Sequence, residues 1–448
     1  MSNVETTAAS VAAAPPVKVL STGYRAYALG LLLVIYILNF VDRSVINILA
    51  EPIKNDLGLL DWHIGLMSGL AFAVFYTFLG LPIAQLAEKY NRPLIISVAL
   101  AVWSAFTALS GLAQNFVQLV LARIGVGIGE AGCTPPAHSL ISDYVPRERR
   151  ASALAFYSMG IPLGGLVGMA VGGIVADAYG WRVAFFVCGL PGVIVAIIAA
   201  LTLVETRSPD AVKAKALRLD DFKTTLSTLA LKRTFWLVAF AASIKAFIGY
   251  GHAPFTASFF LRNHPEQIAS LAASFDLKSV GFIGLALGLI AGTAGAVGAM
   301  LGGLIADKYG ARDLRAYVSV PAVAALITVP VYIFAVTTGN AVVGIGTLAI
   351  NAILGTLWYG PVYATAQSIV PPHMRATAAA ILLFIINLIG LGLGPLAVGI
   401  LSTALAISWE FGEAEGVRWA LILSTLPNAV CFWLFWRARR TIRDEIVS

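Results

Sequence analysis

The sequence predicts an all-α membrane protein that crosses the bilayer twelve times and consists of two related six-helix halves. Three observations predict this class: an apolar composition, a series of long apolar runs, and loop motifs that recur in the second half. Of the 448 residues, 59% are hydrophobic and only 12% are charged, whereas soluble domains usually carry about 25% charged residues. Since a water-soluble fold cannot hide this much apolar surface, lipid must form part of the solvent.

Twelve apolar runs are long enough to cross about 30 Å of hydrocarbon at roughly 1.5 Å per residue. They cover residues 25–49, 62–87, 93–113, 116–142, 150–176, 181–203, 235–260, 279–306, 315–336, 341–369, 376–406 and 418–437. The predicted organisation is a disordered tail (1–23), an N-terminal bundle (24–205), a linker (206–233), a C-terminal bundle (234–438) and a second tail (439–448). Residues 217–231 of the linker have apolar side chains at partly helical spacing, so this stretch is either a helix on the membrane surface or part of a flexible tether.

Lysines and arginines are distributed unequally between the two sets of predicted loops. With a cytoplasmic N-terminus, the opposite side holds only five of the 30 basic residues: Lys54, Arg182, Arg262, Lys278 and Arg418. Because cytoplasmic loops carry the excess of positive charge, we expect a multi-pass inner-membrane protein with both termini in the cytoplasm. The net charge of +7 comes from short clusters between apolar runs and not from a basic face, so no nucleic-acid partner is expected.

Loop motifs in the two halves repeat at the same positions relative to the spans. Residues 84–92, after the second run, and 303–312, after the eighth, both contain a small residue, three spacers, an acid, Lys-Tyr, a turn residue and a later arginine. Residues 146–153 and 372–378 form a second matching pair, and Gly180-Trp-Arg182 matches Gly416-Val-Arg418. Repeated halves are typical of secondary transporters, whose site lies near the midplane where the halves meet.

The first loop motif resembles the A motif of the major facilitator superfamily. The copy at 303–312 is complete, while Ala84, Glu88 and Asn91 depart from the pattern in the other copy. The resemblance implies the major facilitator fold, with two pseudo-symmetric bundles that work by alternating access. It also implies a cytoplasmic latch between helices, made of Glu88, Lys89, Arg92, Asp307, Lys308 and Arg312. The alternative is that these charges only fix the orientation in the membrane.

Three strings resemble the Spinster family of that superfamily more closely: residues 39–43, 88–92 and 123–131. The family resemblance implies a proton-coupled transporter of an amphipathic or lipid-like solute, including anionic solutes of the lysolipid or sphingoid-phosphate type. The string Asn-Phe-x-Asp-Arg at 39–43 also occurs in organic-anion and sugar-acid symporters of the superfamily. A sugar-acid or organic-anion:cation symporter is therefore the alternative, and it predicts a second strong cationic site in the C-terminal half, where the sequence offers only Lys245.

Four charged residues lie inside the predicted spans of the N-terminal half: Asp42, Arg43, Arg123 and Glu130. Each is costly in the bilayer unless it is paired or hydrated. Arg123 and Glu130 share one helix face, with Gly127 between them to admit a neighbouring helix, and Asp42 and Arg123 lie at matching depths. We predict a charge network of all four that couples transport to protons, because burial favours a protonated carboxylate whereas a nearby arginine favours the ionised form. The alternative is a static salt bridge that holds the bundle together.

The substrate is expected to meet both charged and aromatic side chains. The candidates are Asn39, Arg43, Arg123, Thr134, Lys245, Tyr250, Trp358 and Tyr359. Residues 249–254 and 360–361 contain glycine and proline, and they predict breaks in the seventh and tenth spans. Few charges in the C-terminal wall suit an amphipathic solute better than a polyanion, although any one aromatic can instead serve packing.

An enzyme, a cofactor site and a metal site are not expected. The five histidines are scattered over different spans and loops, the three cysteines lack disulfide or metal spacing, and no catalytic or nucleotide-binding motif is present. We expect a monomer whose partners are its solute, protons and membrane lipid.

Overall fold

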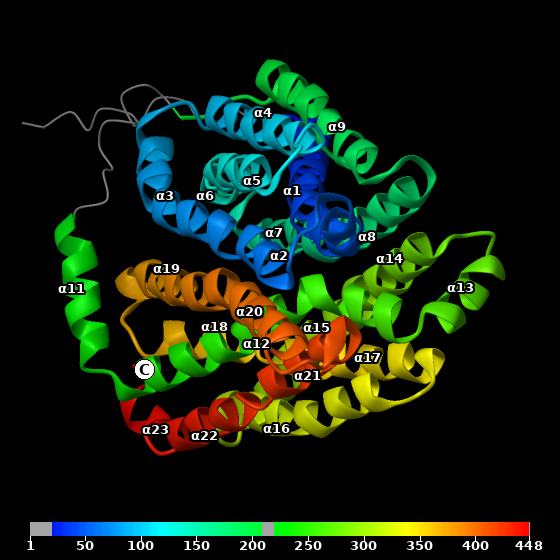
Figure 1. Ribbon diagram of the computed structural model, residues 1–448. Helices are drawn as coiled ribbons and strands as arrows, with labels where there is room; N and C mark the ends of the chain where they lie inside the picture. Colours follow the sequence, from blue (N-terminus) through cyan, green and yellow to red (C-terminus); the bar gives the residue numbers. More distant parts are fainter. Residues whose placement is uncertain (1–19, 208–218, 448) are drawn as a thin grey trace, which may run out of the picture.

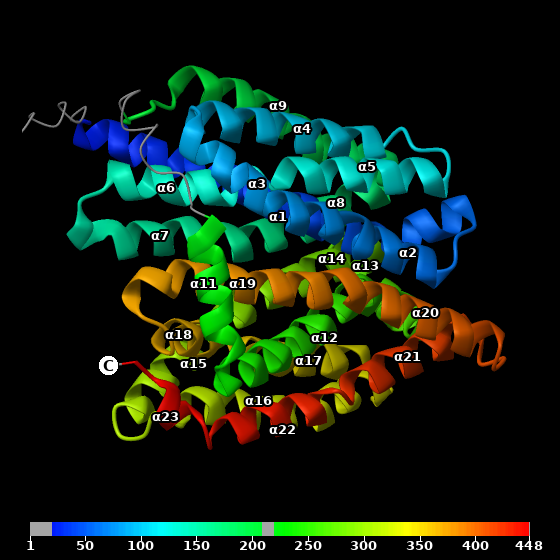
Figure 2. The same cartoon turned by 90° about the vertical axis from the view of Figure 1, so that its left-hand side faces the viewer.

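The computed structural model describes residues 20–207 and 219–447, and this part of the chain is helical, with no strand. It contains twelve helical segments that are long and apolar enough to cross a membrane, as the sequence predicts. Figure 1 shows two bundles, one built from α1–α9 and the other from α12–α22. We call the end of the molecule where α1 begins and α22 ends the inner end, and the opposite end the outer end (Figure 2).

In the described residues, nine α-helices make up the six spans of the N-terminal bundle. They are α1 (Thr22–Leu57), α2 (Asp61–Ser68), α3 (Leu70–Lys89), α4 (Arg92–Ser110), α5 (Phe116–Glu130), α6 (Thr134–Tyr144), α7 (Arg150–Ser158), α8 (Gly160–Tyr179) and α9 (Trp181–Thr202). The predicted tail at 1–23 lies mostly outside the described residues.

The C-terminal bundle repeats this arrangement. It contains α12 (Arg233–Asn263), α13 (Pro265–Ala273), α14 (Ser279–Leu289), η2 (Ile290–Ala294), α15 (Gly295–Gly310), α16 (Ala316–Thr337), α17 (Ala341–Thr356), α18 (Tyr359–Ser368), α19 (Arg375–Ile386), η4 (Asn387–Leu393), α20 (Gly394–Ile407), α21 (Gly412–Thr425) and α22 (Asn428–Ala438). A short helix, α23 (Ile442–Glu445), follows. Between the bundles, α11 (Leu219–Ala230) packs beside α19 (Figure 1), while residues 208–218 of the linker lie outside the described residues.

Prolines lie just after the points where two spans are interrupted. The span of α5 and α6 is interrupted after Glu130, and Pro135 and Pro136 stand in the first turn of α6, where their missing N–H groups are not needed. Likewise α17 ends at Thr356 and α18 starts at Tyr359, close to the break predicted at 360–361.

The break predicted at residues 249–254 is wrong, since α12 runs without interruption through Pro254. The glycines there have other uses. A Cβ on Gly251 would come within 3.0 Å of the backbone oxygen of Gly394, so Gly251 lets α20 pack closely. Gly249 has nothing within 4 Å of where its Cβ would lie, and it faces the cavity described below.

A glycine contact also brings α3 against α5, as the sequence predicts. A Cβ on Gly127 would lie 2.6 Å from the backbone oxygen of Phe72. This contact places the charged end of α5 next to the aromatic residues of α3.

Candidate functional site

A cavity with two adjoining lobes lies between the bundles. The first, the N lobe, has a volume of about 340 Å³ and is lined by α1, α2, α3 and α5 on one side and by α12, α17, α18, η4 and α20 on the other. The second, the C lobe, has a volume of about 250 Å³ and lies mainly within the C-terminal bundle. Asn47, Lys245 and Asn351 line both lobes, so the lobes share a wall.

One ion pair stands behind the wall of the N lobe. Nε of Arg43, on α1, lies 2.5 Å from Oε2 of Glu130, the last residue of α5. Arg43 lines the lobe with 15% of its side chain exposed, whereas the Glu130 side chain is completely buried and does not line it. The Arg43 guanidinium also lies 5.1 Å from the ring centres of Phe40 and Phe72. Arg43 therefore stands between the cavity and a buried carboxylate.

Arg123 and Asp42 do not form the ion pair that their matching depths predict. The Arg123 guanidinium donates to the backbone oxygen of Asp42 at 3.4 Å, and its carbon lies 5.5 Å from the ring centre of Phe72. Both residues are 1% exposed, and neither pairs with an opposite charge within the described chain. The predicted network of four charges thus contains a single ion pair, and Arg123 lines the N lobe as a buried cation.

Lys245 is a second buried cation without a carboxylate partner in the described residues. Its ammonium donates to Thr328 Oγ1 at 3.2 Å and to Asn428 Oδ1 at 3.1 Å. About two helical turns further on, His252 lines the C lobe, with Nε2 3.0 Å from Ser424 Oγ and its ring stacked on Tyr332.

The charged residues that line the cavity are all positive among the described residues. Arg43, Arg123 and Lys245 line it, and no aspartate or glutamate is among the described residues that do. An uncompensated buried cation is costly, and an anion in the cavity would offset that cost. The arrangement is suited to binding a negatively charged group beside an aromatic wall.

The structure brings most of the predicted substrate residues to this cavity. Arg43, Arg123, Lys245, Tyr250, Trp358 and Tyr359 line the N lobe, and the rings of the last two stack with their centres 4.2 Å apart. Asn39 is buried and Thr134 half-buried, and neither lines either lobe. Asn47, Asn351 and Tyr332 are among the lining residues that were not predicted. An asparagine inside an apolar run is the only signal that could have indicated the first two.

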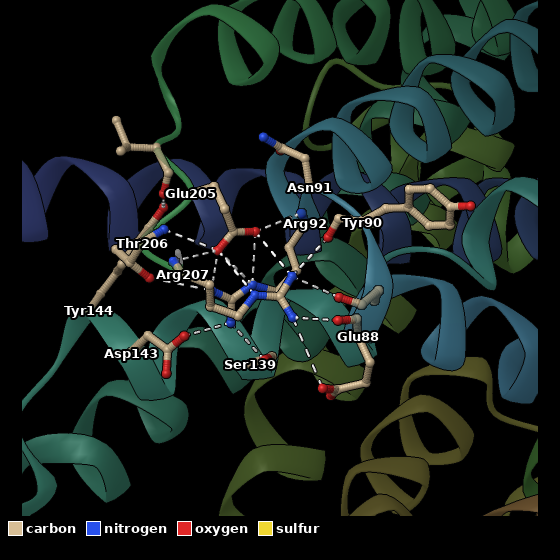
Figure 3. A network of polar contacts seen from close by, with 12 residues as sticks. Glu88, Tyr90, Asn91, Arg92, Ser139, Asp143, Tyr144, Glu205, Thr206 and Arg207 are labelled. Carbon is tan, nitrogen blue, oxygen red and sulfur yellow. Dashed lines mark hydrogen bonds and ion pairs between the residues drawn. The ribbon is translucent and has the colours of Figure 1, made fainter. Parts of the chain in front are cut away.

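A polar network surrounds Arg92 at the inner end of the N-terminal bundle (Figure 3). Its guanidinium pairs with Asp143 at 2.7 Å and with Glu205, and donates to Ser139 Oγ at 2.8 Å. Arg92 begins α4, Asp143 lies on α6 and Glu205 follows α9. The network therefore ties three spans of one bundle together.

Arg207 extends the same network (Figure 3). It donates to the backbone oxygens of Ala87, Glu88 and Tyr90, which caps the end of α3, and it also bonds Glu205. Burial alone would raise the pKa of Glu205, but hydrogen bonds from Arg92 and Arg207 lower this pKa to about 2.

The other residues of the predicted latch are not paired with one another. The Glu88 carboxylate is 4.0 Å from Arg207, and Asp307 accepts a hydrogen bond from the Tyr317 hydroxyl at 2.9 Å. Within the described chain, Lys89, Lys308 and Arg312 form no ion pair. The acids and bases of the two loop motifs therefore do not connect the bundles in this state.

A charge cluster that the sequence does not predict joins the bundles at the outer end instead. Arg262 of α12 reaches across to α1 and α2, with Nη2 2.6 Å from Glu51 and 2.8 Å from Asp61. Lys54 of α1 pairs with Asp61 at 3.1 Å and with Glu413 of the C-terminal bundle at 2.8 Å. We call these five residues the outer cluster. Charged residues are common at the ends of membrane spans and therefore do not indicate a cluster. The only signal in the sequence is the small set of basic residues predicted on this side, which includes Lys54 and Arg262.

Close backbone packing accompanies the outer cluster. A Cβ on Gly65 would lie 2.3 Å from the backbone oxygen of Pro395, and Ser402 donates to Asp61 at 2.6 Å. Every ion pair between the bundles in the described residues lies at this end. The protein is therefore closed at its outer end.

Two six-helix bundles that enclose a central cavity and close at one end define a membrane transporter whose solute site lies between its two halves. The chain belongs to the Major Facilitator Superfamily, whose family model matches residues 32–395.

The chain resembles three known proteins in different degrees. It is 32% identical to an MFS-type efflux pump of Mycolicibacterium smegmatis, over 93% of this chain and 94% of that one. It is 30% identical to the hexuronate transporter of Bacillus subtilis over 56% of this chain and 60% of that one. A crystal structure of a bacterial homologue of the human lysosomal transporter Spinster, inward-facing and occupied, matches with a TM-score of 0.83 and 32% identity, covering 96% of this chain and all of that one.

Proposed function

We propose that the protein is a proton-coupled transporter of an amphipathic anion, such as a lysolipid or a sphingoid phosphate. The observation that carries the proposal is the lining of the central cavity, where Arg43, Arg123 and Lys245 lie beside aromatic rings and no acidic side chain is among the described lining residues. A phosphate or carboxylate headgroup would bind the cations. An acyl chain would lie along Tyr250, Trp358 and Tyr359.

Arg43 supports a coupling mechanism because it has a carboxylate on one side and the cavity on the other. An anionic headgroup that binds Arg43 from the cavity competes with Glu130 for the guanidinium. Glu130, which is completely buried, would then carry an uncompensated charge unless it takes up a proton. Solute and proton therefore bind together, and loss of the proton restores the ion pair and expels the anion.

The outer cluster supports alternating access. With the outer end closed by Arg262 and Lys54, solute would enter and leave the cavity from the inner end. In the opposite state these ion pairs separate, and the loop-motif residues at the inner end, among them Glu88, Lys89, Asp307, Lys308 and Arg312, become the latch. We also propose that the inner end faces the cytoplasm of a bacterial cell, as the distribution of lysine and arginine predicts, and that the protein works as a monomer.

A sugar-acid or organic-anion symporter is the second candidate. The hexuronate transporter among the relatives favours it, and so does the position of Lys245 beside the polar groups of the C lobe, Asn351 and His252. The aromatic wall and the size of the N lobe favour the amphipathic anion, because a small sugar acid would not fill the lobe and has no acyl chain to lie along its aromatic wall.

Reconstituted vesicles that contain a pH-sensitive dye distinguish the two candidates. We expect lysophosphatidic acid or sphingosine 1-phosphate to drive proton movement in the wild type, and glucuronate to drive none. The Glu130→Gln variant should lose solute-driven proton movement, while Glu148→Gln, at an exposed position near the inner end, should retain it. Proton movement with glucuronate alone would replace the first candidate by the second. Lipid-driven proton movement that survives Glu130→Gln would leave Glu130 as a structural residue.

A further inference from the structure

A groove at the inner end of the C-terminal bundle is separate from the transport cavity. It lies between the start of α12 and the end of α22, has a volume of about 540 Å³, and shares no lining residue with either lobe. Figure 2 shows α22 along the edge of the molecule that is remote from the N-terminal bundle. The groove is therefore on the outside of the protein, where the membrane would surround it.

Three arginines line this groove: Arg233, Arg437 and Arg440. Arg233 is the first residue of α12 and Arg437 lies in the last turn of α22, so the cations converge at the ends of two adjacent helices. All three are exposed, and none forms an ion pair with any residue that the structure describes. No acidic side chain is among the lining residues.

A carboxylate beside the groove already has hydrogen-bond partners. Glu445 of α23 accepts the backbone N–H groups of Arg233 and Thr234, both at 3.0 Å, and so caps the start of α12. It bonds the backbone of Arg233 and not its guanidinium. The three arginines are thus left to bind an anion from outside the protein.

The floor of the groove is aromatic and faces away from the core. Trp433 is 52% exposed and Phe240 is 44% exposed, and Trp236 completes the surface. The Arg437 guanidinium lies 5.3 Å from the ring centre of Trp433. Tryptophan and arginine together at the end of a transmembrane helix are typical of the boundary between lipid tails and headgroups.

We propose that this groove binds an anionic phospholipid of the surrounding membrane, with its phosphate on the arginines and its acyl chains along Trp236, Phe240 and Trp433. Charge complementarity and the apolar floor together select this occupant. A soluble phosphate would use the arginines only, and a zwitterionic phospholipid brings its own cation to a site that already has three.

Native mass spectrometry of the delipidated protein in detergent tests the proposal. Phosphatidylglycerol is titrated against the wild type, against Arg437→Gln/Arg440→Gln, and against Arg149→Gln/Arg375→Gln. The last variant removes two exposed arginines from the same end of the protein but outside the groove. Phosphatidylcholine with the same acyl chains and inorganic phosphate serve as the other ligands. Thermal unfolding of each variant without added lipid shows whether it is folded.

We expect the groove variant to bind phosphatidylglycerol about 25-fold more weakly than the wild type, since each arginine near an anionic lipid contributes roughly five-fold. The control variant should bind it like the wild type, and phosphatidylcholine should bind weakly to all three. Equal binding to the groove and control variants would overturn the proposal. So would equal affinity for the two phospholipids, or displacement of phosphatidylglycerol by inorganic phosphate at millimolar concentration.

Discussion

Replacing Arg262 by glutamine should open the outer end of the protein. The Arg262 guanidinium donates to Glu51 and Asp61, and the three side chains are 8%, 12% and 3% exposed. Removing one member of a buried ion pair usually costs about 3–5 kcal/mol, because the partner charge is left buried and unpaired.

The expected effect lies at or just below the lower limit of that range. Lys54 remains 3.1 Å from Asp61 and still neutralises part of its charge, while Glu51 has no other ion-pair partner among the described residues. We therefore expect the closed state to lose about 2–3 kcal/mol relative to the state in which water reaches these carboxylates, which shifts the equilibrium roughly 30- to 150-fold.

Distances between spin labels at Gln114→Cys and Ser408→Cys measure this shift, because both positions are exposed at the outer end and belong to different bundles. The native Cys133, Cys188 and Cys431 are buried and should not be labelled. We expect one short distance in the wild type and an added longer one in Arg262→Gln. Arg182→Gln is the matched control, since Arg182 pairs with Asp56 of its own bundle at 2.6 Å. An unchanged distribution in Arg262→Gln, or the same change in both variants, would refute the reasoning.

Three further predictions concern the cavity, the inner network and helix packing. Lys245→Met should weaken binding of an anionic solute about ten-fold, as measured by equilibrium binding, because one charge-assisted hydrogen bond contributes roughly 1.5 kcal/mol; an equal loss for an uncharged analogue would contradict this. Because hydrogen bonds lower the pKa of Glu205 to about 2, its contribution to stability is complete above the unfolded-state pKa of about 4.3 and is lost as the pH falls from there toward 2. The unfolding temperature of Glu205→Gln should therefore approach that of the wild type as the pH falls over this range. A difference between the two unfolding temperatures that does not change with pH would argue against the ion pairs of Glu205 as the source of the stabilisation. Gly127→Ala should destabilise the protein by about 1–3 kcal/mol, since the new Cβ would lie 2.6 Å from the Phe72 oxygen, while Gly30→Ala, with nothing within 4 Å, should leave the unfolding temperature nearly unchanged.

The fold could be predicted from the sequence because lipid imposes a simple requirement. Each span must be long, apolar and helical, so the twelve runs could be counted without knowledge of their packing. Residues 249–254 show the limit of this reasoning. Glycine and proline there also permit close helix packing, and only the neighbouring α20 decides that α12 continues through them.

The sequence indicated which charged residues belong to the candidate site, but not which of them contact one another. A charge inside an apolar run is conspicuous, and this led to Arg43, Arg123, Glu130 and Lys245. Which charges meet depends on the rotation of each helix about its axis, which sequence spacing does not fix. Arg43 and Glu130 therefore pair, while Asp42 and Arg123 touch only through a backbone oxygen. The outer cluster depends on contacts between α1, α2 and α12 that span more than 200 residues of the chain.

The position of Arg43 between the cavity and Glu130 has an electrical consequence for the proposed cycle. In the empty site, the charge of Arg43 is balanced by Glu130. In the loaded site it is balanced by a monoanionic solute, while the proton on Glu130 removes the second negative charge. The mobile part of the protein then carries the same net charge in both states. Under this mechanism the electrical work on the loaded carrier and on the returning empty carrier cancels over one cycle, and the pH difference across the bilayer alone decides in which direction a monoanionic solute accumulates.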